Sequence, residues 1–315
     1  MTGKKPLPTG IHEGISDVDY HADKTSLSSS GARTLARPGG PAKFKSQQEA
    51  PEADTTAFRF GRAAHAVLVQ GVPLGDDGIA VLPDEKTTVT IINPDPCPED
   101  EDPEEWYAPK KAKMTKTAAS KTARGWAAHH GHHTFVTQDE AALLEDMRAA
   151  LLEHPKAAEL LNAPGRAEVS VITNHPVTGI RVKARPDYWL DEPGEDGRTI
   201  IVDYKTTDDA SPAGFARSAR MYGYDQAAAW YRMVLDLADA GTEARMIFIA
   251  QEKTPPYLVA VYELTEEDLD AAAEKNEIAI GRYEAGLRFD LWPGYGDGEV
   301  QPLPLTWAPR KGNNA

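Results

Sequence analysis

Apolar residues recur at the three-to-four-residue spacing of helices in four stretches of the chain. The run TTAFRFGRAAHAVLV predicts a helix over residues 55–69 with an apolar face that carries His65. The same spacing predicts longer helices over 139–161, 212–240 and 266–287. A shorter helix is predicted within SLSSSGARTLARPGGPAKF, where Ser28, Ser29 or Ser30 is a suitable N-cap and Pro38 ends the helix.

After Pro164 the pattern changes to short β-type runs separated by turn residues. AEVSVIT, GIRVKARPDYWL and RTIIVDYKTT predict three strands over 167–173, 179–190 and 198–207. Two further strands, ARMIFIAQE and YLVAVYEL, follow the 212–240 helix. Helix, three strands, helix, two strands and helix is an order typical of an α/β fold, so we expect a mixed β-sheet flanked by helices.

Two neighbouring segments of opposite charge interrupt this pattern. Residues 73–108 are rich in Asp, Glu and Pro and predict an exposed acidic insertion. The next segment, PKKAKMTKTAASKTARGW, is basic. We therefore expect an N-terminal extension over 1–54, a main domain over 55–295 that contains the insertion, and a C-terminal tail over 296–315.

Composition narrows the class of protein. No stretch approaches the roughly 18 apolar residues of a membrane span, and no apolar segment follows the basic N-terminus as in a signal peptide. The single cysteine, Cys97, excludes an intrachain disulfide and suits a reducing cytoplasm. The formal net charge of −15 argues against a protein that coats nucleic acid over its whole surface, although a local basic groove remains compatible with it.

The candidate chemistry lies in Arg185-Pro186-Asp187 and in Asp203-Tyr204-Lys205. Side chains alternate across a strand, so Asp203 and Lys205 project from one face, and Asp187 at the end of the preceding strand can approach them. Carboxylates are the ligands that Mg²⁺ prefers, and a bound divalent ion can activate water and stabilise phosphate charge. Glu168, on the first predicted strand, is a candidate further ligand.

Each of these residues also has a structural interpretation. An Asp-x-Lys pair on a strand is commonly a surface ion pair, but here it directly follows the apolar run Ile200-Ile201-Val202, where charges are costly unless paired or metal-bound. His65 on an apolar helix is more often a core histidine. The tract His129, His130, His132 and His133 fits a solvated loop better than a zinc site.

The ordered set RPDYW, IIVDYKTT and YGYDQAAAWYR resembles the RecB-like branch of the PD-(D/E)xK nucleases, and most closely the RecE-type exodeoxyribonuclease VIII proteins of phages and prophages. SLSSSGARTLARPGGPAKF, GRAAHAVLV, QEKTPPYLVAVYEL and LWPGY extend the resemblance over about residues 15–295. It implies metal ligation by His65, Asp187 and Asp203, less firmly by Glu168, and a catalytic role for Lys205. Gln226 corresponds to the glutamine of the family motif that supports the lysine. The aromatic position four residues later is Trp230, with Tyr231 next to it.

The resemblance implies an Mg²⁺- or Mn²⁺-dependent exodeoxyribonuclease that degrades one strand of linear duplex DNA from 5′ to 3′ and leaves 3′ tails for recombination. It also implies a homo-oligomeric ring around DNA ends and a single-strand annealing protein as partner. One cysteine cannot hold an iron–sulfur cluster, and no P-loop is present, so neither a cluster nor ATP is expected. The alternatives are an endonuclease or repair nuclease on the same core, or a catalytically silent DNA-binding module. The expected DNA contacts are Lys110, Lys111, Lys113, Lys116, Arg185, Tyr222 and Tyr224.

Overall fold

The computed structural model describes residues 6–49, 56–75, 78–131, 134–238, 243–298, 300 and 303. Its largest sheet has five strands in the order β13-β12-β11-β10-β7. These are β7 (Gly165–Ala167), β10 (Tyr188–Leu190), β11 (Ile200–Thr207), β12 (Arg245–Glu252) and β13 (Val259–Glu263). β11 and β12 pair in parallel over eight residues, and the other neighbours are antiparallel. The predicted α/β class with a mixed sheet flanked by helices is confirmed.

A second sheet has four strands in the order β1-β8-β9-β2. These are β1 (Gly10–His12), β2 (Leu27–Ser28), β8 (Ser170–Asn174) and β9 (Arg181–Ala184). The segment assigned to an N-terminal extension therefore supplies two strands of this sheet. It also supplies Leu27, Leu35 and Phe44 to the main apolar core, so residue 54 does not mark a boundary of that core.

The two sheets are joined by one long hairpin that bends at the same level in both arms. The predicted strand over 167–173 contains β8 and meets β7 only at Ala167; the two strands are separated at Glu168, whose φ of 56° is in the left-handed region. The predicted strand over 179–190 is two strands, β9 and β10, separated at Arg185-Pro186-Asp187. The Glu168 N–H donates to the Asp187 carbonyl at 3.3 Å, which holds the two bends together. Both arms thus leave one sheet and enter the other at the candidate carboxylates.

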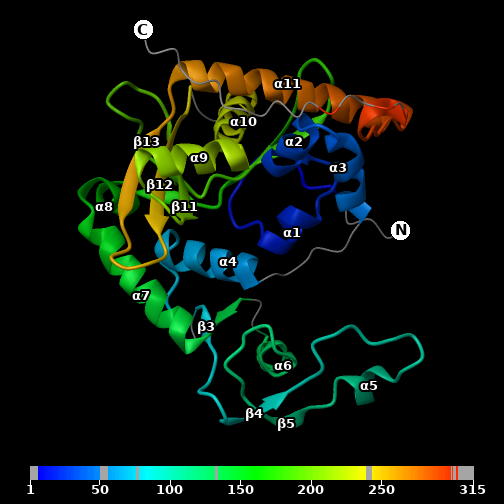
Figure 1. Cartoon of the computed structure of the whole chain (residues 1–315), viewed down its shortest axis with the longest axis vertical. Helices are drawn as coiled ribbons and strands as arrows, with labels where there is room; N and C mark the ends of the chain where they lie inside the picture. The colour runs from blue at the N-terminus through cyan, green and yellow to red at the C-terminus, as the bar shows by residue number, and fades with distance from the viewer. Residues whose placement is uncertain are drawn as a thin grey trace.

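Helices cover both faces of the five-stranded sheet (Figure 1). On one face, Ile201, Met246 and Phe248 pack in a core with α2 (Ser29–Ala36), α10 (Tyr224–Leu237) and α11 (Glu266–Phe289). On the other face, Val202 and Tyr204 share a core with α4 (Thr56–Leu68), α7 (Gln138–Glu153) and α8 (Pro155–Asn162). The remaining helices of the main body are α1 (Asp17–Ala22), α3 (Gly40–Glu49) and α9 (Pro212–Tyr222), and a 3₁₀ turn spans Gly296–Gly298.

Two of the predicted helices are each divided in two. The 139–161 helix is broken between α7 and α8 at His154, because Pro155 cannot donate to the preceding turn and instead occupies the first position of α8, which His154 caps through Ala157 N. The 212–240 helix is broken at Gly223, which takes a left-handed φ of 68° between α9 and α10.

A smaller unit with its own apolar core lies at the opposite end of the molecule from α11 (Figure 1). Its elements are β3 (Ala80–Val81), β4 (Thr88–Ile91), α5 (Pro103–Trp106), β5 (Lys110–Lys113), α6 (Lys121–His129) and β6 (Phe135–Val136). The acidic insertion is anchored in this unit: the Trp106 indole donates to the Asp95 carbonyl at 3.0 Å, and the Asp95 carboxylate pairs with Lys121 and Arg124. The helices of the described ranges include none that is long and apolar enough to cross a membrane.

Candidate metal centre

Three potential metal ligands from three elements meet at the bend of the hairpin. His65 comes from α4, Glu168 from the turn between β7 and β8, and Asp187 from the turn before β10. His65 Nε2 lies 3.0 Å from Asp187 Oδ2, and His65 Nδ1 lies 3.2 Å from Glu168 Oε1. One ligand atom from each residue falls within 4.8 Å of the others, which is compatible with a single ion. One imidazole and two carboxylates are a donor set that fits Mg²⁺ or Mn²⁺.

Asp203 and Lys205 lie beside this set on β11. Lys205 Nζ makes an ion pair with Asp203 Oδ2 and lies 3.9 Å from Asp187 Oδ2. Within the described residues, the group that could hold a metal comprises His65, Glu168 and Asp187, and Asp203 lies outside it. Asp203 was expected, with Asp187, as a principal metal ligand; here its carboxylate is engaged by Lys205, so its metal ligation stays a prediction.

The orientation of Asp187 is fixed by the backbone of β11. The Tyr204 N–H donates to Asp187 Oδ2 at 2.8 Å, which ties the carboxylate to the central strand of the five-stranded sheet. The Tyr204 side chain points to the opposite side, where its hydroxyl donates to Gln251 Oε1 within the core. Strand alternation thus places Asp203 and Lys205 on the site side and Tyr204 in the core.

Opposite charges control protonation at the site. Burial alone would lower the pKa of His65, but Asp187 and Glu168 outweigh burial and raise this pKa to about 9. Burial would raise the pKa of Asp187, yet the charges of His65 and Lys205 lower it to about 2. For Asp203, burial and the neighbouring Asp187 charge raise the pKa to about 6. Burial opposes the charge of Lys205, but Asp203 and Asp187 raise its pKa, so the ammonium is protonated at neutral pH.

The aromatic residues of the YGYDQAAAWYR segment divide between site and core. Tyr224 lies under Lys205, whose Nζ is 5.6 Å from the ring centroid, and Tyr222 stacks on Tyr224 with ring centroids 5.8 Å apart. Trp230 is fully buried and its indole donates to the Lys183 carbonyl at 2.9 Å. Tyr231 is also affected by the charges of the site: burial, and then the charge of Asp203, raise its pKa.

Gln226 is buried on α10, and its carbonyl accepts from Asn276 Nδ2 at 3.2 Å. Its Nε2 has no hydrogen-bond partner among the described residues, and none of their contacts joins it to Lys205. The expected support of the lysine by this glutamine therefore stays a prediction.

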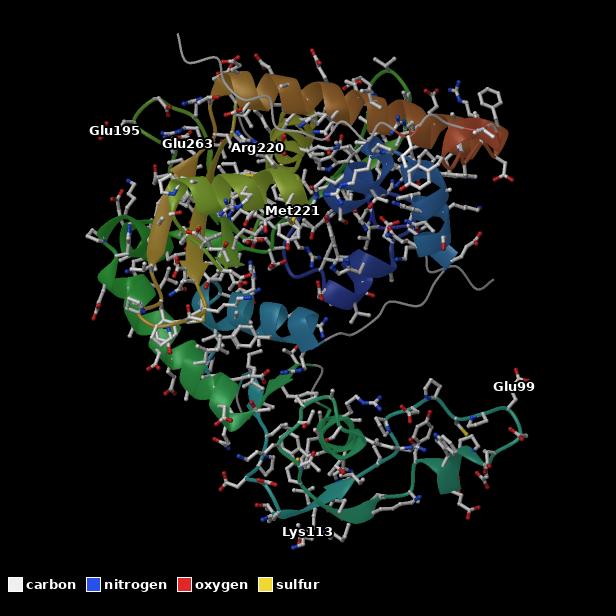
Figure 2. All side chains as sticks on the ribbon, viewed as in Figure 1. Glu99, Lys113, Glu195, Arg220, Met221 and Glu263 are labelled. Atoms are coloured by element: carbon white, nitrogen blue, oxygen red, sulfur yellow. The ribbon has the colours of Figure 1, made fainter. Side chains whose placement is uncertain are left out.

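The predicted DNA contacts are placed very differently from one another. Lys110, Lys111 and Lys113 are exposed on β5 of the smaller unit, and Lys116 is exposed just beyond that strand. Figure 2 shows Lys113 at the outer end of this unit, on the side away from the main sheet. Arg185 is buried, and protein groups engage its guanidinium.

The described part of the histidine tract, His129 and His130, does not belong to the ligand set of the centre. His129 ends α6, His130 forms its C-cap, and His132 and His133 lie outside the described residues. Sequence reasoning missed Gln70, whose Nε2 donates to Glu168 Oε1 at 3.4 Å and lies 3.3 Å from His65 Nδ1. Gln70 follows the end of α4 in a turn, so no helical or strand periodicity could have connected it to His65.

Comparisons with known proteins agree with this architecture. The family described as "PDDEXK-like domain of unknown function (DUF3799)" matches residues 28–301. A search of curated proteins found no match to the sequence. A crystal structure described as "Putative exonuclease" from Eubacterium rectale is similar over 94% of this chain and 97% of its own, with a TM-score of 0.56 and 13% identity, which shows a shared fold.

A second solved structure, described as SSO0001, covers 44% of this chain and 60% of its own at 18% identity. Its TM-score of 0.26 is too low to indicate a common fold. The family match, by contrast, spans far more than half of the chain and includes every residue of the metal centre; strand β1 precedes the matched region. The chain therefore belongs to the family of PDDEXK-like domains (DUF3799).

Proposed function

We propose that this protein is a metal-dependent deoxyribonuclease that hydrolyses phosphodiester bonds in DNA. The observation that carries the proposal is the convergence of His65, Glu168 and Asp187 beside the Lys205 ammonium. A bound Mg²⁺ or Mn²⁺ would lower the pKa of the attacking water and neutralise phosphate charge. His65, Glu168 and Asp187 would hold the ion, and Asp203 is proposed to complete the set once its contact with Lys205 rearranges.

Lys205 supplies positive charge where the phosphate reacts. Asp203 and Asp187 keep its ammonium protonated, so its proposed role is to orient the attacking water by donating a hydrogen bond and to stabilise the negative charge of the phosphorane. A protonated lysine cannot accept the proton of the water, so we assign proton acceptance to another group or to solvent.

The exposed end of α9 is the proposed DNA contact nearest to the centre. Tyr222 is 53% exposed and Met221 is 62% exposed, and the Tyr222–Tyr224 stack connects this surface with Lys205. Arg220, on the same helix end, is also exposed, and Figure 2 shows it near Met221 on α9. An exposed aromatic ring beside arginine suits a base and its phosphate.

The finer features of the proposal are supported by the resemblance of the sequence to RecE-type nucleases. They are 5′ to 3′ degradation of linear duplex DNA, release of 3′ tails for recombination, a homo-oligomeric ring, a single-strand annealing partner and a cytoplasmic location. A ring would reconcile the net charge of −15 with DNA binding, because only its channel need be basic. Molar mass by light scattering, with and without duplex DNA, tests the ring directly.

Digestion of linear duplex DNA tests the activity. We expect loss of the linear substrate with Mg²⁺ or Mn²⁺, no loss with EDTA, and at least a 100-fold lower rate for Lys205→Ala, because mutation of one charge-stabilising group typically costs about 10²–10³ in rate. Lys156→Ala, on the exposed surface of α8, is the matched control and should retain activity. Cleavage of closed circular DNA would indicate an endonuclease, and no cleavage of either substrate would leave the silent DNA-binding module.

A further inference from the structure

Three basic side chains, two on one side of β9 and one directly after this strand, hold the N-terminal segment, residues 7–23, by its backbone. Arg181 donates to the Leu7 carbonyl, and Lys183 Nζ donates to the Tyr20 carbonyl at 2.5 Å and to the Asp23 carbonyl at 2.8 Å. Arg185, two residues further, donates to the Ile15 carbonyl at 3.0 Å. The alternate residues Val182 and Ala184 are buried in the core on the other side.

Arg185 joins this segment to the metal centre. Its Nε donates to Ser170 Oγ at 2.9 Å and lies 3.6 Å from Glu168 Oε2. Its guanidinium carbon lies 3.9 Å from the centroid of the Tyr20 ring, and its Nη1 lies 3.7 Å from Asp17 Oδ1. Only 7% of Arg185 is exposed, so the side chain is committed to these partners and has little surface with which to bind a DNA phosphate.

Glu168 is the ligand that most needs such support. Its backbone is in the left-handed region with φ 56°, a conformation that a residue other than glycine rarely adopts without surrounding constraints. Its side chain is 31% exposed, compared with 15% for Asp187 and 18% for His65. The Arg185 guanidinium approaches Oε2, while Gln70 and His65 contact Oε1, so the two oxygens are held from opposite sides.

We propose that Arg185 is a positioning residue for metal binding, and that residues 7–23 belong to the metal centre because they hold the Arg185 guanidinium against Glu168. This replaces the DNA contact expected for Arg185 from the sequence. The inference rests on the proposed metal centre. It assigns to the N-terminal segment an indirect role in forming that centre, through Arg185.

Mn²⁺ binding by calorimetry, with full-length protein and no DNA, tests this role. Loss of a group that orients a metal ligand typically weakens metal affinity about 10- to 100-fold, and we expect Arg185→Met to fall in that range. Arg185→Lys retains the charge but lacks the fork that spans Ile15 and Glu168, so we expect an intermediate affinity. Urea unfolding of each variant in EDTA shows whether the fold is retained.

Arg181→Met is the matched control, because Arg181 contacts only the first residue of the segment, Leu7, and Ser26 beyond its end. It touches neither the part of the segment that contacts Arg185 nor, among the described residues, the ligand set. We expect its Mn²⁺ affinity to stay within about threefold of the wild type. Wild-type or tighter affinity in both Arg185 variants would overturn the proposal, as would an equal loss in Arg181→Met. A wild-type protein that binds no Mn²⁺ would remove the proposed metal centre itself.

Discussion

His65 is a partly buried imidazole whose protonated form is stabilised by two carboxylates. Its ring nitrogens face Asp187 on one side and Glu168 on the other, so without an ion the protonated ring compensates the charges that a metal would otherwise neutralise. Metal binding requires the neutral imidazole, and the proton must leave before the ion enters. Proton and metal are therefore competitors for the same three side chains.

The raised pKa of His65 predicts that this residue contributes to the stability of the metal-free protein in a pH-dependent way. The folded-state pKa of about 9 is above the unfolded value of 6.5, so the contribution is fully present below about pH 6.5 and is lost as pH rises through 9. With about 1.4 kcal/mol per pKa unit, the free energy of unfolding should favour wild type over His65→Gln by up to about 3 kcal/mol more at pH 6 than at pH 9.5. Urea unfolding in EDTA measures this difference. An equal difference between the two proteins at both pH values would contradict the prediction.

At the scale of elements, the longer helices and strands of the main body were predictable from periodicity, and their interruptions and the short elements of the smaller unit were not. The sequence indicated one strand over 167–173 and one over 179–190, but an apolar run does not reveal that the chain leaves one sheet for another within it. That change depends on the Glu168–Asp187 backbone hydrogen bond and on α10 filling the space between the sheets. Asp187, Asp203 and Lys205 were recognisable because their chemistry conflicts with an apolar strand, whereas Gln70 carries no such conflict.

The break between α9 and α10 depends on one glycine. Gly223 has φ 68°, and a Cβ there would lie 3.1 Å from Arg33 Cδ. We therefore expect Gly223→Ala to lower the free energy of unfolding by about 1–2 kcal/mol, because an L-residue pays roughly that cost in the left-handed region. Gly281 is at an exposed position of α11, with no atom within 4 Å of the place its Cβ would take. Gly281→Ala should therefore be neutral or stabilising by up to about 1 kcal/mol. Chemical unfolding of both variants measures the pair, and equal effects would contradict this reasoning.

At the scale of the whole molecule, the charged groups proposed to act on DNA are divided between the main body and the smaller unit. The metal centre lies in the main body, and the exposed lysines of β5 lie on the smaller unit, where Figure 2 shows Glu99 and Lys113 at separate ends of that unit. On β5, Lys111 and Lys113 project on the same side as Thr90 and Thr88, whose hydroxyls accept from their ammonium groups at 2.7 Å. A duplex that contacts both the lysines of β5 and the metal centre would have to reach from the smaller unit to the main body.

Substitution of these lysines tests that arrangement. If Lys111 and Lys113 each neutralise one phosphate, Lys111→Gln with Lys113→Gln should reduce the slope of log affinity against log salt by about 1.8, at 0.9 per phosphate. Fluorescence anisotropy with a duplex oligonucleotide, in the Lys205→Ala background, measures the slope without cleavage. The added Lys156→Ala control should not change it. An unchanged slope in the double variant would show that Lys111 and Lys113 do not contact DNA phosphates.

The bent hairpin has a consequence for how the molecule opens. Because Glu168 and Asp187 lie at the bend, and His65 reaches them from α4, the centre is assembled only while the two sheets and α4 are seated together. An ion bound there links α4 to both arms of the bend, and its binding free energy adds to the free energy needed to separate the two sheets and α4. A local separation of the two sheets and α4 at the bend would release the ion while both apolar cores stay folded. The rate of metal exchange therefore reports how often the bend opens, and slow exchange indicates that the two sheets and α4 rarely separate.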